Sequence, residues 1–152
     1  MERLRTLGVG AGAGAAATLV MSGAMIAAER LGLMGRMPPE EISKRAVERV
    51  QGSEDAPRQV VDLLAPVAHV GFGMAAGSLF ALLSRRGRAP LSPVLQGVVF
   101  GVGVWLVSYF GWLPALRLMP PAQRDEPGRQ PAMLAAHLVY GAVLGGLAGR
   151  RD

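Results

Sequence analysis

The sequence predicts an all-α membrane protein: four transmembrane helices built as two parallel two-helix repeats, plus an amphipathic helix in the first outer loop. The main observation is that the 152 residues, 51% hydrophobic with 21 glycines, contain four long runs free of Asp, Glu, Lys and Arg. A bilayer core about 30 Å thick is crossed by roughly 20 apolar residues of helix. The runs are residues 7–28, 63–83, 94–113 and 131–148.

The first run also resembles a signal peptide, because Arg3 and Arg5 precede an apolar stretch that ends in small residues. Its length exceeds the roughly 7 to 15 apolar residues of a signal-peptide core. We therefore expect residues 7–28 to remain in the protein as its first span.

The outer segment, residues 29–62, is predicted to contain a surface helix. Pro38 and Pro39 suit a first helical turn, and the acidic residues after them favour the positive end of the helix dipole. The segment lies on the outer membrane face, caps the bundle, or is a solvated connector. An apolar stripe before Gly52 is formed by Ile42, Ala46, Val47 and Val50.

Two short matches indicate an internal duplication within a single membrane domain, residues 1–152. AHVGFGMAAG at 68–77 and AHLVYGAVLG at 136–145 both fit A-H-x-x-[FY]-G-x-x-x-G, and the preceding helix of each pair runs into Met-Pro-Pro. Two spans per repeat return the chain to its starting side, so the repeats are parallel. Repeat one covers residues 7–83 and repeat two covers residues 94–148.

Every predicted span carries glycines four residues apart, which places them on one helix face. Small residues on such a face let two helices approach closely. We expect these helix-packing positions to be Gly10, Gly14, Gly73, Gly77, Gly97, Gly101, Gly141 and Gly145.

The basic residues predict the orientation. The termini and the segment between the second and third spans hold seven Arg against two acids, whereas the other two connections are neutral together. Because Lys and Arg collect on the cytoplasmic side, we expect both termini in the cytoplasm. The seven are Arg3, Arg5, Arg85, Arg86, Arg88, Arg150 and Arg151.

The two histidines lie on the glycine faces near the outer ends of their spans. His69 shares its face with Phe72 and Gly73, and His137 shares its face with Tyr140 and Gly141. Three interpretations remain open: hydrogen bonds to a neighbouring helix, a metal or haem site, and a proton or ion pathway.

Methionine adds to the metal hypothesis, because Met21 and Met25 form an M-x-x-x-M on the outer half of the first span. Thioether and imidazole ligands together suit Cu(I), although Met also packs readily into apolar interfaces. The candidate polar or metal site is thus His69, His137, Met21 and Met25. No cofactor is predicted from the pattern itself.

The sequence gives little support for catalysis. It has no intramembrane carboxylate, no G-x-S-x-G and no H-E-x-x-H, so we expect no enzyme and no catalytic residues. The acidic loop residues are interpreted as solvated charge: Glu40, Glu41, Asp125 and Glu126. The absence of cysteine excludes disulfides and thiolate metal sites, and no nucleic-acid-binding pattern accompanies the net charge of +5.

Four short spans, a Pro-rich outer loop (LPALRLMPPAQRDEP, residues 113–127) and a last helix containing AHLVYG resemble the YagU-like group of small bacterial inner-membrane proteins. The resemblance implies a multi-pass protein of the bacterial inner membrane without an established activity, and it supplies no catalytic residues. The chain departs from that group in its charged outer segment, Glu40 to Asp62, and in its small size.

Two functions follow from these features. The first is a structural or accessory subunit whose glycine faces pack its spans together and contact itself or a larger membrane complex. The second is a small transporter or channel for an ion, proton or metal that uses His69 and His137. The expected partners are the lipid bilayer and, for the first function, a second copy of the protein or a larger membrane complex. The inner halves of the second and fourth spans are almost wholly apolar, which favours the first function.

Overall fold

The computed structural model describes residues 1–86 and 90–149 of the chain. Over these residues the fold is all-helical, and four of its helices are long and apolar enough to cross a membrane. They are Glu2–Arg30, Arg58–Arg85, Pro93–Ala115 and Arg129–Ala148. The prediction of a membrane-type helical protein is therefore confirmed at this level. The first two helices extend beyond the predicted spans at both ends, because their charged flanking residues continue the helix.

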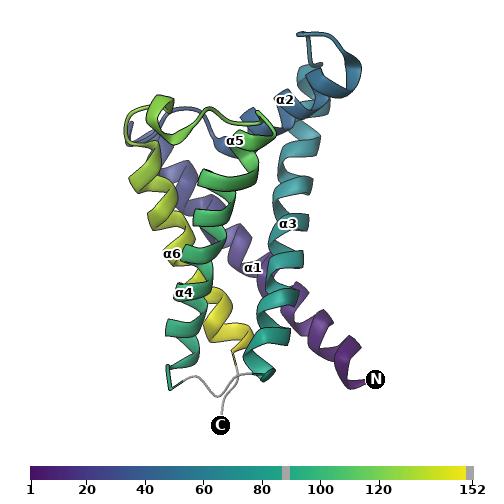
Figure 1. Ribbon diagram of the computed structural model, residues 1–152, viewed down its shortest axis with the longest axis vertical. Helices are drawn as coiled ribbons and strands as arrows, with labels where there is room; N and C mark the ends of the chain where they lie inside the picture. Colours follow the sequence, from purple (N-terminus) through teal and green to yellow (C-terminus); the bar gives the residue numbers. More distant parts are fainter. Residues whose placement is uncertain (87–89, 150–152) are drawn as a thin grey trace.

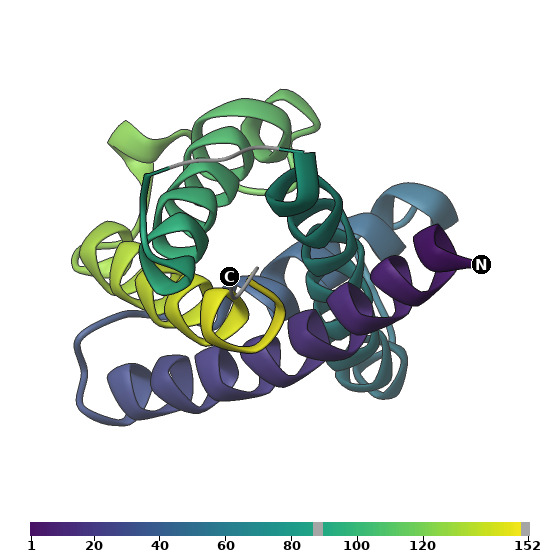
Figure 2. The same ribbon diagram turned by 90° about the horizontal axis from the view of Figure 1, so that it is seen from below.

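The helices form a bundle in which α1 (Glu2–Arg30) and α6 (Arg129–Ala148) lie next to each other along one side (Figures 1 and 2). α1 packs along α3 (Arg58–Arg86) on one side and along α6 on the other, and α6 in turn packs along α4 (Pro93–Leu106). α3 and α4 touch only sparsely. The bundle is thus two tight helix pairs, α1 with α3 and α4 with α6, joined through α1 and α6.

Glycines mark the closest approaches within both pairs. A methyl group built on Gly10 of α1 would lie 2.5 Å from the carbonyl oxygen of Gly77 on α3. In the other pair, a methyl group on Gly97 of α4 would lie 2.6 Å from Cα of Gly145 on α6. Real Cβ atoms do not come so close, so these helices touch backbone to backbone. All eight glycines predicted as packing positions lie at such approaches.

Aromatic side chains bridge the sparse contact between α3 and the third span. The rings of Phe80 and Phe100 lie 5.3 Å apart, and those of Phe72 and Trp112 lie 5.9 Å apart. These are ordinary separations for paired aromatic rings. Two pairs of aromatic rings, rather than backbone contact, connect α3 to the third span.

The segment between α1 and α3 folds as α2 (Pro38–Gln51), with both prolines in its first turn and Gly52 left-handed at its end (φ 66°). α2 lies at the end of the bundle opposite both termini, together with residues 116–128 (Figure 1). We call this the capped end. Pro38, Ser43 and Val47 are buried, whereas Val50, predicted on the apolar stripe, is 88% exposed. That assignment was wrong because Val50 falls in the last turn, beyond the bundle.

The third span changes its helical form near the capped end. After α4 it continues as a π-helical segment, η1 (Val107–Trp112), and ends as α5 (Leu113–Ala115). Pro114 explains the change: it has no N–H to donate, and its ring conflicts with the carbonyl of the residue four positions earlier, Phe110. A wider π turn removes this conflict, and such turns are frequent at functional sites.

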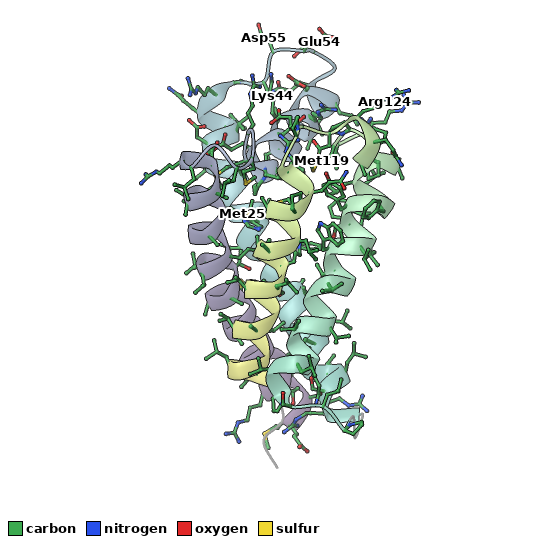
Figure 3. The ribbon with its side chains drawn as sticks, turned by 90° about the vertical axis from the view of Figure 1, so that its left-hand side faces the viewer. Met25, Lys44, Glu54, Asp55, Met119 and Arg124 are labelled. Carbon is green, nitrogen blue, oxygen red and sulfur yellow. The ribbon has the colours of Figure 1, made fainter. Side chains whose placement is uncertain are left out.

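Both termini lie at the same end of the bundle, and charged side chains gather at its two ends (Figures 1 and 3). If the basic residues set the orientation, a reporter active only in the cytoplasm will be active when fused after Asp152 and inactive when inserted between Ser53 and Pro57. The opposite pattern would contradict a cytoplasmic location of the termini. Of the residues behind this prediction, Arg88, Arg150 and Arg151 lie outside the described residues.

Substitution of the glycines tests the packing of the pairs. Gly73→Leu and Gly141→Leu are expected to lower the free energy of unfolding in detergent by about 1 to 3 kcal/mol, because the new side chain meets Thr18 of α1 at position 73 and the backbone of α4 at position 141. Gly71→Leu and Gly103→Leu are matched controls, since a Cβ there meets nothing within 4 Å. Equal stability of contact and control variants would show that backbone approach is not what holds the pairs together.

Candidate functional site

A cavity of about 310 Å³ lies in the half of the bundle nearest the capped end. All four membrane-crossing helices contribute to its wall, and α2 forms its roof through Pro38, Pro39, Ile42 and Ser43. The wall is largely apolar and aromatic. The aromatic side chains that line it are Phe72, Trp105, Tyr109, Trp112 and Tyr140.

The four residues predicted as a polar or metal site all line this one cavity. Met21 and Met25 reach it from α1, His69 from α3 and His137 from α6. Figure 3 shows Met25 in the upper part of the bundle, below the charged residues of the capped end. The structure thus gathers residues that the sequence places on three different helices.

Each histidine already has one polar partner. Nδ1 of His137 lies 2.8 Å from the carbonyl oxygen of Met133, one turn earlier on the same helix. Because a carbonyl only accepts, Nδ1 carries the hydrogen, and Nε2 is left as an acceptor in the neutral ring. Nδ1 of His69 lies 3.3 Å from the hydroxyl oxygen of Ser22 on α1. The His69 contact is of the kind expected for a bond to a neighbouring helix, whereas His137 contacts its own helix.

Most other polar atoms of the wall are paired. Tyr140 donates to the carbonyl of Gly73 at 2.9 Å, and Trp112 Nε1 donates to the hydroxyl of Ser108 at 3.2 Å. Thr18 donates to the carbonyl of Gly14 at 2.8 Å. Trp105 differs, because its Nε1 is buried and has no hydrogen-bond partner among the described residues.

A buried charge cluster closes the capped end. The Arg129 side chain is fully buried at the start of α6 and forms ion pairs with Asp125 at 2.5 Å, Glu41 at 3.1 Å and Glu126 at 3.1 Å. It also donates to the carbonyl of Arg36 at 2.9 Å. One guanidinium therefore joins α2, both outer connections and α6.

The cluster also reaches the cavity wall, since the Tyr109 hydroxyl donates to Asp125. The Tyr109 ring stacks on Trp105 with centroids 5.8 Å apart. Arg129 thus positions α2, the roof of the cavity, through its ion pair with Glu41. Through Asp125 it also positions Tyr109 in the cavity wall. It is a positioning residue for the cavity, because it does not line the cavity itself.

The sequence-based interpretation of the acidic loop residues was wrong for the two that matter here. The side chains of Asp125 and Glu41 are only 1% and 17% exposed, so they are not solvated charges. Glu40 is exposed as expected, and Glu126 is 44% exposed but paired. The available signal was the spacing of Asp125 and Arg129, four residues apart at the start of a helix. Glu41 was not recognisable, because its contact joins distant parts of the chain.

The fold and the cavity define a helical protein of membrane type, with four helices long and apolar enough to cross a bilayer and a partly open, mainly apolar site at one end. The chain belongs to a family of unknown function, DUF6789, whose model matches residues 4–152. No curated protein and no solved structure matches the chain. None of these comparisons links it to the YagU-like group.

Loss of Arg129 tests the charge cluster. Arg129→Ala leaves the carboxylates of Asp125 and Glu41 without their cation, so we expect a loss of about 3 to 5 kcal/mol in the free energy of unfolding in mixed micelles. Arg124→Ala, at an exposed position in the same connection, is the control and should change stability by less than about 0.5 kcal/mol. A loss equally small for Arg129→Ala would refute the positioning role.

Proposed function

We propose that this protein binds a small, neutral, lipid-soluble molecule in the cavity at its capped end. The observation that carries the proposal is the cavity itself: about 310 Å³, partly open, bordered by all four long helices and α2, and lined mainly by apolar and aromatic side chains. Cavities of this size and character, with a few polar groups, are typical of small-molecule sites. The described lining residues include no Asp, Glu, Lys or Arg, which favours an uncharged ligand.

The other half of the bundle supports binding rather than conduction. Below the cavity, Leu144 is fully buried and Phe80 is 3% exposed, and the rings of Phe80 and Phe100 pack together. An ion path needs polar groups along its whole depth. In the half away from the capped end the buried polar side chains, Thr6 and Ser84, are paired with carbonyls of their own helices, so this half offers an ion no row of free polar groups among the described residues. This arrangement favours a molecule that is held over one that passes through.

The sequence also predicted a structural role for the glycine faces, and in this proposal that role is to hold the cavity together. The glycine faces that were candidates for binding another subunit are occupied inside the chain, where Gly10, Gly14, Gly73 and Gly77 pack against one another. They build the scaffold of the cavity. In the bacterial inner membrane, with both termini in the cytoplasm, the cavity lies in the outer half of the bilayer. The proposal includes no catalytic step.

A metal site is the second candidate, favoured by the gathering of Met21, Met25, His69 and His137 around one cavity. The described residues contain no group of three or more His, Cys, Asp and Glu arranged to hold a metal. Such a site therefore depends on methionine sulfur, which suits Cu(I). The accepting Nε2 of His137 is the ring nitrogen available for it.

Binding is tested with 2-methylnaphthalene, a neutral two-ring hydrocarbon, added to the protein in lipid nanodiscs. We expect a saturable rise in unfolding temperature, because a ligand that binds only the folded state stabilises it. Ala68→Phe, which places a ring in the cavity wall, should abolish the rise. Ala75→Phe, exposed on the same helix and not a lining position, should retain it.

The absence of saturable stabilisation in the unmodified protein would contradict the proposal. Copper and haem iron are measured in the same preparations. A stoichiometric metal that is lost from both His69→Ala and His137→Ala would establish the second candidate in its place.

A further inference from the structure

The size and shape of the cavity restrict what it accepts. Its volume of about 310 Å³ is about twice that of a cavity of roughly 150 Å³ that holds one benzene ring. Flat aromatic side chains, among them the stacked Trp105 and Tyr109, form much of its wall. A planar molecule of two fused rings fits both the volume and the faces available for stacking.

The unpaired Nε1 of Trp105 indicates that the ligand carries a polar group. It is buried and has no partner among the described residues, while the other tryptophan of the wall, Trp112, has Ser108. An indole N–H only donates, so the missing partner is an acceptor. Although the wall holds neutral acceptors such as the Ser108 hydroxyl, none is hydrogen-bonded to Trp105 Nε1 among the described residues, so this donor is free for an acceptor on the ligand. A carbonyl oxygen is a strong neutral acceptor that a fused ring system can carry.

The route of entry follows from which sides are closed. Glycine contacts close the α1–α3 and α4–α6 sides, and the packing of α1 along α6 closes a third side. α2 and the Arg129 cluster close the roof, and Phe80 with Phe100 closes the floor. The remaining side, between α3 and η1, is bridged by Phe72 and Trp112, and Phe72 is 44% exposed. Figure 2 shows α3 and the third span standing apart on this side, and in a bilayer this side would be next to lipid.

We propose that the ligand is a neutral two-ring quinone or aromatic ketone that enters from the bilayer between α3 and η1 and accepts a hydrogen bond from Trp105. The inference rests on the proposed function, since it names the chemical class bound by the same cavity. A hydrocarbon substituent on the ring system extends from the site into lipid through the Phe72–Trp112 side.

The test compares 2-methyl-1,4-naphthoquinone with 2-methylnaphthalene, which has the same ring system and no carbonyl. In nanodiscs, with empty nanodiscs correcting for partition into lipid, we expect the quinone to bind about tenfold more tightly, the value of one hydrogen bond. Trp105→Phe should remove this preference, so that the two compounds bind with equal affinity. In Trp112→Phe, where Trp105 is the only tryptophan, the quinone should quench the remaining fluorescence saturably.

The route is tested by the rate of quenching. Phe72→Ala should accelerate quenching severalfold, whereas Leu79→Ala, exposed on α3 outside the cavity wall, should leave the rate unchanged. Equal rates in both variants would overturn lateral entry between α3 and η1.

The failures of the two proposals are distinguishable. If both compounds bind saturably with equal affinity and Trp105→Phe alters neither, the carbonyl assignment is overturned while the cavity remains a binding site. If neither compound binds saturably, the proposed function and the present inference are both overturned.

Discussion

The close approach of helix backbones at glycine is the constraint on which the rest of this structure depends. In a membrane, helices gain little from apolar burial against one another, so contact area and close packing carry the association. Gly10 and Gly14 meet Gly73 and Gly77, and the same arrangement recurs between α4 and α6. Two pairs drawn together so tightly leave α3 and α4 apart, and the space that remains near the capped end is the cavity.

The buried Arg129 cluster completes that space. Burying a guanidinium is costly unless carboxylates and carbonyls satisfy it, and Arg129 draws these partners from α2 and from both outer connections. Because the buried Arg129 must be paired, its contact with Glu41 holds α2 over the cavity. Through Asp125 it also fixes Tyr109, and Tyr109 orients Trp105, the side chain with the unpaired donor. Packing in the membrane and charge at its surface therefore act on the same site.

The π-helical turn is the local adjustment that makes the wall aromatic on its inner side. Pro114 forces the wider turn, and the residues within it include Ser108, Tyr109 and Trp112, which all line the cavity. The wider turn associated with Pro114 therefore sets the direction of three cavity-lining side chains. The described residues that line the cavity include no charged side chain, so this turn supplies much of the surface that a ligand would contact.

The sequence by itself determined the helical class and the four long apolar helices, because charge-free runs depend only on composition and helix geometry. Four-residue spacing also singled out four residues that line the cavity. His69, His137, Met21 and Met25 were found in this way, as were the glycine positions. Tertiary structure alone decided that Asp125 and Glu41 are buried partners of Arg129, that Val50 extends beyond the bundle, and that Trp105 Nε1 lacks a partner. These properties depend on contacts between residues far apart in the chain or on the shape of the space between helices, which periodicity along one helix does not encode.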